Sequence, residues 1–315
     1  MLFRSPGHAR GIPGLTRMQI SANGIALEVQ DHGPTSGEPL LLIMGLGMQL
    51  VAWPEGLVRL LVQRGFRVIR FDNRDIGLSQ HFDHLGLPNV MLDAIKHSVG
   101  LNVKSGYSLA DMADDCAGVL AALGIVRANV FGVSMGGMIA QHLAARHPKR
   151  VKSLTLMMTS SGARHLPGPT MKVRAAMLGR PEKPGDMNAL LAYYVRLYRL
   201  IGSPGFPSDD AVIAARAEGW LQRSNHPAGN LRQLVAIAAD GDRSAMLKQL
   251  AVPTHLLHGR DDALVPVASG VDLAKKIPGA ALTVIDGMGH DLPEALWPRF
   301  VGGIESAVSR TAESG

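Results

Sequence analysis

Residues 128–147 read ANVFGVSMGGMIAQHLAARH, and this stretch predicts a buried strand that turns directly into a helix. The strand ends in the apolar residues Val130, Phe131 and Val133, and apolar residues recur at helical spacing from Met138 onward. The pentapeptide at residues 132–136, Gly-Val-Ser-Met-Gly, matches the pattern G-x-S-x-G in the strand–turn–helix context that this motif requires.

The glycines of this motif have a physical role. A strand that turns straight into a helix forces its corner residue into a strained conformation, so the side chains two positions to either side must be nearly absent. We therefore expect Ser134 to stand on the corner with its hydroxyl exposed. The backbone N–H groups that follow lie at a helix N-terminus and favour negative charge on a group that the hydroxyl attacks. The alternative is a Gly-Ser turn of purely structural role, and the rest of the chain must decide between the two.

Length and composition are those of an ordinary globular protein. The 315 residues are 46% hydrophobic and 18% charged, which permits one large α/β domain or a domain with a sizeable insertion. The net charge of +6 comes from scattered Lys and Arg residues, so no nucleic-acid partner is expected.

The apolar run at residues 40–44 is broken by Gly45 and Gly47, so no membrane span is predicted. Residues 1–16 carry Arg, Pro and Gly where a signal peptide has an apolar core, which predicts a loose tail and a cytoplasmic protein.

The single cysteine, Cys116, excludes a disulfide within the chain. It falls on one apolar helical stripe with Leu109, Met112, Leu120 and Leu123. We interpret it as a packed hydrophobic side chain rather than as a nucleophile.

The chain begins with a predicted hairpin and continues as alternating strands and helices. Residues 17–30 alternate apolar and polar across Asn23-Gly24, the strongest short hairpin signal. Residues 39–44 form a continuous apolar run, typical of a strand buried on both faces of a parallel sheet. The run ends in Gly45-Leu46-Gly47, but Leu50 stands where a dinucleotide-binding loop needs a small residue. We expect instead a flexible loop whose backbone N–H groups face a ligand.

Two polar loops follow the next strand, residues 66–71. The turn at residues 72–79, Asp-Asn-Arg-Asp-Ile-Gly-Leu-Ser, is interpreted as an ion-paired structural corner. Residues 81–84, His-Phe-Asp-His, have the side-chain types of metal ligands, but no Cys or His clusters beside them in the sequence. We therefore predict a solvated loop, with no metal and no cofactor.

The regular alternation stops at residue 160 and resumes at residue 254. Residues 160–250 are rich in Pro and Gly and carry helical patterns such as 190–200 and 211–220, which predicts a helical insertion over the C-terminal edge of the sheet. Its aromatic side chains are interpreted as the insertion's own core, with pocket walls as the alternative: Tyr193, Tyr194, Tyr198 and Trp220. The strands at 254–258 and 281–285 then end in loops that carry Asp261, Asp262 and His290, on the same edge as Ser134.

The order Ser134, Asp262, His290 is the order of the catalytic triad in α/β-hydrolases, and the surrounding residues resemble that family. The resemblance runs over about residues 18–308, with a core at 17–159 and 251–315 and a helical cap at 160–250. It implies a mostly parallel, eight-stranded α/β sheet with helices on both faces. Bacterial carboxylesterases of the aclacinomycin methylesterase type are the most similar group, through Met44-Gly45-Leu46-Gly47, Trp53-Pro54 and residues 72–79. Many relatives have His-Gly where this chain has Met44-Gly45, which changes the expected pocket shape but keeps the backbone donor.

The resemblance implies a serine esterase. Ser134 is the expected nucleophile, His290 the base and Asp262 the residue that orients the imidazole, while Asp261 has no expected catalytic role. The backbone N–H groups of Leu46 and Met135 are expected to bind the oxyanion. The expected partner is a small-molecule ester, and the chain is a monomer or a homodimer.

One enzymatic and one non-enzymatic alternative stay open, and a further alternative, an aspartate nucleophile, is disfavoured. Cofactor-free perhydrolases (haloperoxidases) and carbon–carbon bond hydrolases use the same triad, and a ligand-binding protein on this fold is the non-enzymatic alternative. An aspartate nucleophile, as in dehalogenases and epoxide hydrolases, is disfavoured because the corner residue is Ser134.

Overall fold

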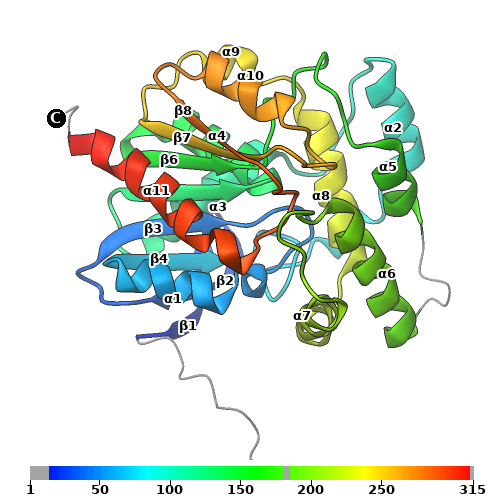
Figure 1. Cartoon of the computed structure of the whole chain (residues 1–315), viewed down its shortest axis with the longest axis horizontal. Coiled ribbons are helices and arrows are strands. Elements are labelled where there is room, and N and C mark those ends of the chain that lie inside the picture. Colours follow the sequence, from blue (N-terminus) through cyan, green and yellow to red (C-terminus); the bar gives the residue numbers. More distant parts are fainter. Residues whose placement is uncertain (1–13, 180–184, 313–315) are drawn as a thin grey trace, which may run out of the picture.

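A computed structural model describes residues 14–179 and 185–312, and its centre is one eight-stranded sheet in the order β1-β2-β4-β3-β5-β6-β7-β8 (Figure 1). Strands β1 and β2 and strands β2 and β4 pair antiparallel, and all other neighbours pair parallel. The predicted fold class is therefore confirmed. The strands are β1 (Thr16–Ala22), β2 (Ile25–His32), β3 (Glu38–Ile43), β4 (Phe66–Phe71), β5 (Ala128–Val133), β6 (Val151–Met157), β7 (Thr254–Gly259) and β8 (Ala281–Ile285).

The predicted hairpin is confirmed as the β1–β2 connection. Asn23 and Gly24 both have positive φ, 50° and 79°, which is the conformation that a two-residue hairpin turn of type I′ requires. Of the predicted tail at residues 1–16, residues 1–13 lie outside the described residues, and strand β1 begins at Thr16.

Helices cover both faces of the sheet. Leu40 and Leu42 of β3 lie on one face, in one apolar cluster with residues of α1 (Glu55–Gln63) and α11 (Trp297–Ala312). Leu41 and Ile43 face the other side, in one apolar cluster with residues of α3 (Leu109–Ala122), α4 (Met135–Arg146) and α10 (Ala268–Lys276). This burial on both sides explains the uninterrupted apolar run. Cys116 is buried within α3 as predicted, and burial raises the pKa of its thiol well above the ordinary range.

The described residues between β6 and β7 form helices and no strand. Apart from α9 (Ser244–Leu247), which lies beside α10, these helices lie with α2 (Val90–Ser98) beyond one edge of the sheet (Figure 1). Helix α2 lies outside the predicted insertion and was not anticipated from sequence. The helices between β6 and β7 are α5 (Met171–Leu178), α6 (Met187–Ile201), α7 (Asp210–Arg223), α8 (Pro227–Asp240) and α9 (Ser244–Leu247). Within the described residues, no helix combines the length and the apolar character that crossing a membrane requires.

Candidate active site

Ser134 stands alone between strand β5 and helix α4, at the corner that the motif predicts. Its backbone angles are φ 54° and ψ −123°, a strained conformation for a residue with a side chain. A Cβ atom on Gly136 would lie 2.0 Å from the carbonyl oxygen of Ile43, and one on Gly132 would lie 2.4 Å from the carbonyl oxygen of Gly136. Because neither position can accept a side chain, both glycines are needed for this turn.

His290 and Asp262 form a buried hydrogen-bonded pair. Nδ1 of His290 lies 2.7 Å from Oδ2 of Asp262, and both residues are buried. The other carboxylate oxygen, Oδ1, accepts the backbone N–H groups of Leu264 (2.9 Å) and Val265 (2.7 Å). These two bonds hold the carboxylate in one orientation. Asp261 is exposed and accepts the N–H of Gly287 (2.9 Å), so its carboxylate is engaged away from the imidazole.

Ser134 is separate from this pair in the hydrogen-bond pattern of the described residues. In the described part of the chain, no hydrogen bond links the Ser134 hydroxyl to His290. Hydrogen bonds of this kind are often long before substrate binds and shorten in the complex. The structure thus brings the predicted Asp and His together, and it gives the predicted serine the strained corner conformation that the motif implies.

The two predicted oxyanion donors lie on backbone next to Ser134. Met135 is the first residue of α4, so its N–H has no acceptor within the helix. The loop that follows β3 reaches the serine, because a Cβ atom on Gly45 would lie 3.2 Å from Ser134 Cβ. Among the described residues, neither the Leu46 nor the Met135 amide donates to another backbone group outside helices and strands. Both N–H groups are therefore available to a ligand at the corner.

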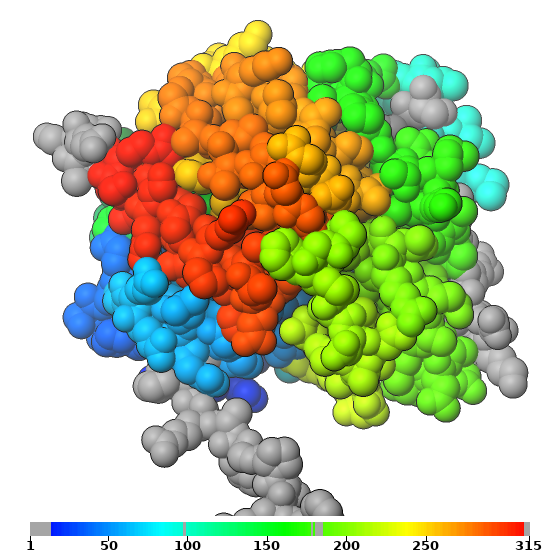
Figure 2. All heavy atoms as spheres, viewed as in Figure 1, coloured from blue at the N-terminus to red at the C-terminus, as the bar shows by residue number. Residues whose placement is uncertain are grey.

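The segment that joins α6 to α7 is fastened to the loop that carries His290. The N–H of His290 donates to the carbonyl of Ile201 (2.6 Å), and the N–H of Gly205 donates to that of Gly287 (2.9 Å). Figure 2 shows this green segment packed directly against the orange-red one. Ser203 Oγ accepts the N–H of Gly289 (2.9 Å) and donates to the carboxylate of Asp291. Sequence reasoning missed these contacts, which join positions more than 80 residues apart.

A second histidine lies beside the buried aspartate without a hydrogen bond to it. His258, at the end of β7, donates from Nε2 to the carbonyl of Val265 (2.8 Å), and this nitrogen lies 3.7 Å from Asp262 Oδ2. Burial lowers the pKa of the His258 imidazole, which favours its neutral form beside Asp262.

The polar turn after β4 is an ion-paired corner, as predicted. Arg74 forms two hydrogen bonds to Asp115 (2.6 and 2.7 Å), and the carboxylate of Asp75 accepts from Arg232 of α8. Asp72 accepts the N–H groups of Leu50 (2.6 Å) and Leu78 (2.9 Å). The turn thus joins the sheet to the helical segment.

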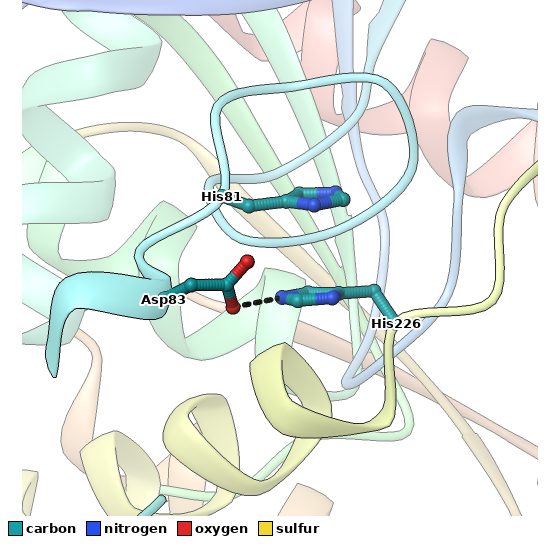
Figure 3. A group of neighbouring side chains, drawn as sticks. All are labelled: His81, Asp83 and His226. Carbon is teal, nitrogen blue, oxygen red and sulfur yellow. Dashed lines mark ion pairs between the residues drawn. The ribbon is translucent and has the colours of Figure 1, made fainter. Parts of the chain in front are cut away.

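His81, Asp83 and His226 come together in a way that sequence spacing did not reveal (Figure 3). One possible ligand atom from each lies within 4.8 Å of the others. The two rings, however, are stacked, with centroids 3.8 Å apart and planes at 5°, so their in-plane lone pairs cannot converge on one ion. Arg232 Nη2 also lies 3.0 Å from His226 Nε2 and 3.1 Å from Asp83, which puts a guanidinium where a metal ion would sit. This arrangement gives no support to a metal site.

The aromatic side chains of the helical segment contact one another in two pairs. Tyr198 of α6 and Trp220 of α7 have ring centroids 5.9 Å apart, and Tyr193 and Tyr194 meet edge to face at 5.6 Å. The first contact joins two helices and agrees with the interpretation of these side chains as the segment's own core.

Known proteins resemble this chain over most of its length. A family model described as "alpha/beta hydrolase fold" matches residues 38–294. The chain is 28% identical over 301 residues to the rhodomycin D methylesterase DauP of Streptomyces sp. (strain C5), covering 89% of this chain and 94% of that protein. It is also 28% identical over 280 residues to the 2-hydroxymuconate semialdehyde hydrolase of Pseudomonas sp. (strain CF600), covering 86% of each. The solved structure of the esterase RhEst1 from Rhodococcus sp. ECU1013 superposes with a TM-score of 0.72 at 21% identity, covering 94% of this chain and 98% of that one.

Proposed function

The chain belongs to the α/β-hydrolase fold family, and we propose that it is a serine esterase that cleaves carboxylic esters of small to medium acyl or alkyl size. The observation that supports this most strongly is the buried His290–Asp262 pair, because a hydrogen bond of 2.7 Å to Nδ1 leaves Nε2 to act as a base. The relatives that are methylesterases favour an ester over other acyl substrates.

The proposed first step is acylation of Ser134. Its Oγ attacks the ester carbonyl carbon while His290 Nε2 takes the hydroxyl proton. The tetrahedral intermediate collapses when the same nitrogen returns that proton to the leaving alcohol. Asp262 holds the imidazole in the tautomer with its proton on Nδ1 and stabilises the imidazolium.

The proposed second step repeats this chemistry with water. His290 takes a proton from the water molecule that attacks the acyl-enzyme, and the acid is released when Ser134 recovers its proton. In both steps the negative charge develops on the former carbonyl oxygen, between the N–H groups of Leu46 and Met135. Removing one such donor typically costs about 3–4 kcal/mol of transition-state stabilisation.

The helical segment would form the substrate-facing side of this site. We propose that residues 17–159 and 251–315 are the core, and that residues 160–250 are a cap that sets which esters are accepted. The contacts of residues 201–205 with the loop that carries His290 support this proposal.

A second candidate is hydrolysis of a carbon–carbon bond. The relative named 2-hydroxymuconate semialdehyde hydrolase favours it, and the same three side chains would serve. Both candidates predict that a fluorophosphonate labels the wild type and not Ser134→Ala.

The experiment that separates them is a substrate panel. p-Nitrophenyl esters from acetate to palmitate are compared with 2-hydroxymuconate semialdehyde, using Ser134→Ala as the blank. Turnover of esters with the semialdehyde inert supports the esterase, and the reverse result supports the second candidate. Absence of labelling and of turnover would contradict both and leave a ligand-binding protein.

A further inference from the structure

The turn that carries Leu46 is held from two sides by side-chain amides. Asn73 Nδ2 donates to the carbonyl oxygen of Met44 (2.9 Å), and Gln233 Oε1 accepts the N–H of Gly47 (2.9 Å). Asn73 belongs to the corner after β4, whereas Gln233 belongs to α8 in the helical segment. The proposed oxyanion donor therefore lies between two anchored peptide groups, and one anchor comes from outside the core.

Gln233 bonds to the peptide group that defines the type of this turn. The N–H of Met48 donates to the carbonyl of Gly45 (3.2 Å), which closes a β-turn over residues 45–48. Gly47, at the third position, has φ 68°, whereas Leu46 does not have a positive φ, as in a type II turn. Types I and II differ in the orientation of the peptide between the second and third residues. The N–H of that peptide is the one that Gln233 accepts.

Both polar atoms of the Gln233 side chain are engaged in hydrogen bonds. Its side chain is completely buried, and its Nε2 donates to the carbonyl of Arg74 (2.9 Å) while its Oε1 accepts from Gly47. Rotating the amide would break both bonds in a buried place, which is costly. Helix α8 also lies in close contact with the turn, since a Cβ atom on Gly47 would lie 2.6 Å from Asn230 Oδ1.

We propose that Gln233 is a positioning residue for the oxyanion hole. By holding the 45–48 turn in one form, it keeps the Leu46 N–H aimed at the carbonyl oxygen of a substrate on Ser134. This inference rests on the proposed function, because it takes the Leu46 N–H as an oxyanion donor. The helical segment then contributes to the rate of the chemical step in addition to ester selectivity.

The test compares Gln233→Leu with the wild type and with the control Ser224→Ala. Leucine has a similar size but neither donates nor accepts, so the turn loses this anchor. Ser224 Oγ donates to the carbonyl of Gly77 (2.8 Å), so its alanine variant removes a contact between the helical segment and the core that involves none of residues 45–48. kcat and KM for p-nitrophenyl acetate are measured with the inhibition constant of a trifluoromethyl ketone, which forms an oxyanion on the serine.

For Gln233→Leu, kcat should fall about 10- to 100-fold with KM changed less than about threefold, the range expected when a donor is misplaced rather than removed. The inhibition constant should rise by the factor by which kcat/KM falls, and Ser224→Ala should stay within about twofold of the wild type. A raised KM with unchanged kcat would overturn the inference, since the helix would then act on binding alone. An equal loss of kcat in Ser224→Ala would also overturn it, because general loosening of the segment would be the cause.

Gln233→Glu is the second variant, for the case in which the leucine variant does not fold. Its neutral carboxyl offers an acceptor and a donor, as the amide does. Its ionised form has no donor for the backbone carbonyl of Arg74 and adds negative charge near the oxyanion. Its kcat relative to the wild type should be highest at low pH and should fall as the carboxyl ionises. A ratio that does not change with pH would contradict the proposal. Ser134→Ala is measured in parallel: if it stays active, the proposed function fails, whereas an inactive Ser134→Ala beside an unaffected Gln233→Leu refutes only this inference.

Discussion

Asp262→Asn should abolish most of the activity while leaving the fold intact, and the structure explains why. Oδ1 of Asp262 accepts two backbone N–H groups, and Oδ2 faces Nδ1 of His290. An asparagine has only one oxygen, and that oxygen must face the two N–H donors of Leu264 and Val265. Its NH₂ group is then turned towards the imidazole.

The imidazole must respond to this change. Because an NH₂ group donates, Nδ1 can approach it only as an acceptor, which moves the ring proton to Nε2. Nε2 can then no longer take the proton of Ser134. The closest general precedent for such a wrongly held tautomer is a loss of about 10⁴ in kcat, equal to about 5.5 kcal/mol in activation free energy.

The assay is kcat for p-nitrophenyl acetate, with circular dichroism and a thermal melt to establish folding. The matched control is Asp261→Asn, next in the chain and bonded to Gly287 rather than to His290. We expect it to change kcat less than about tenfold, since no tautomer depends on it. Equal losses in the two variants, or a larger loss in Asp261→Asn, would refute the assignment of Asp262.

Three further predictions concern the base, the helical segment and the pH dependence of stability. His290→Ala should lose kcat to about the same extent as Ser134→Ala, because members of a triad act as a unit, and one silent variant of the two would refute the triad. The ratio of kcat/KM for a long and a short p-nitrophenyl ester should change in Tyr193→Ala, Tyr194→Ala and Trp220→Ala, since each methylene is worth about 1–3 kcal/mol of activation free energy in such discrimination. The rate with the short ester is the control. A constant ratio in all three variants would assign selectivity to the core. Burial, followed by the Arg70 guanidinium, lowers the pKa of His32 to about 4 from 6.5, so the unfolded chain binds a proton between these values that the folded chain refuses. The contribution of His32 to the free energy of unfolding, at most about 3 kcal/mol, should thus be complete above pH 6.5 and should be lost as the pH falls towards 4. Urea titrations at pH 7 and 4.5 should show a smaller loss of this free energy in His32→Asn than in the wild type. Equal losses in the two proteins would contradict this prediction.

Most of the sheet could be predicted from the sequence because its determinants are local. Two examples depend on residues close in the chain: the Asn23-Gly24 hairpin and the apolar run of β3. The corner at Ser134 is local in part: Gly132 is constrained by the carbonyl of Gly136 within the turn, whereas Gly136 is constrained by the carbonyl of Ile43 on the neighbouring strand β3. The expected site residues could be chosen because they fall at strand ends, which parallel topology brings to one edge.

The helical segment was less accessible to sequence reasoning. Periodicity shows which face of a helix is apolar, but not which helix packs beside it. Helix α2 was not anticipated, and the stacking of His81 on His226 joins two loops far apart in the chain.

The sequence by itself determined the strand–turn–helix corner, the mixed sheet and the order of the serine, aspartate and histidine, because local backbone chemistry and strand topology are enough for these. Only the tertiary structure decided which buried polar groups pair. The contact of Gln233 with Gly47 spans 186 residues, and that of Ser203 with Gly289 spans 86. A buried amide or hydroxyl needs a partner, but the sequence does not say which one, since that depends on how the helices pack against the loops.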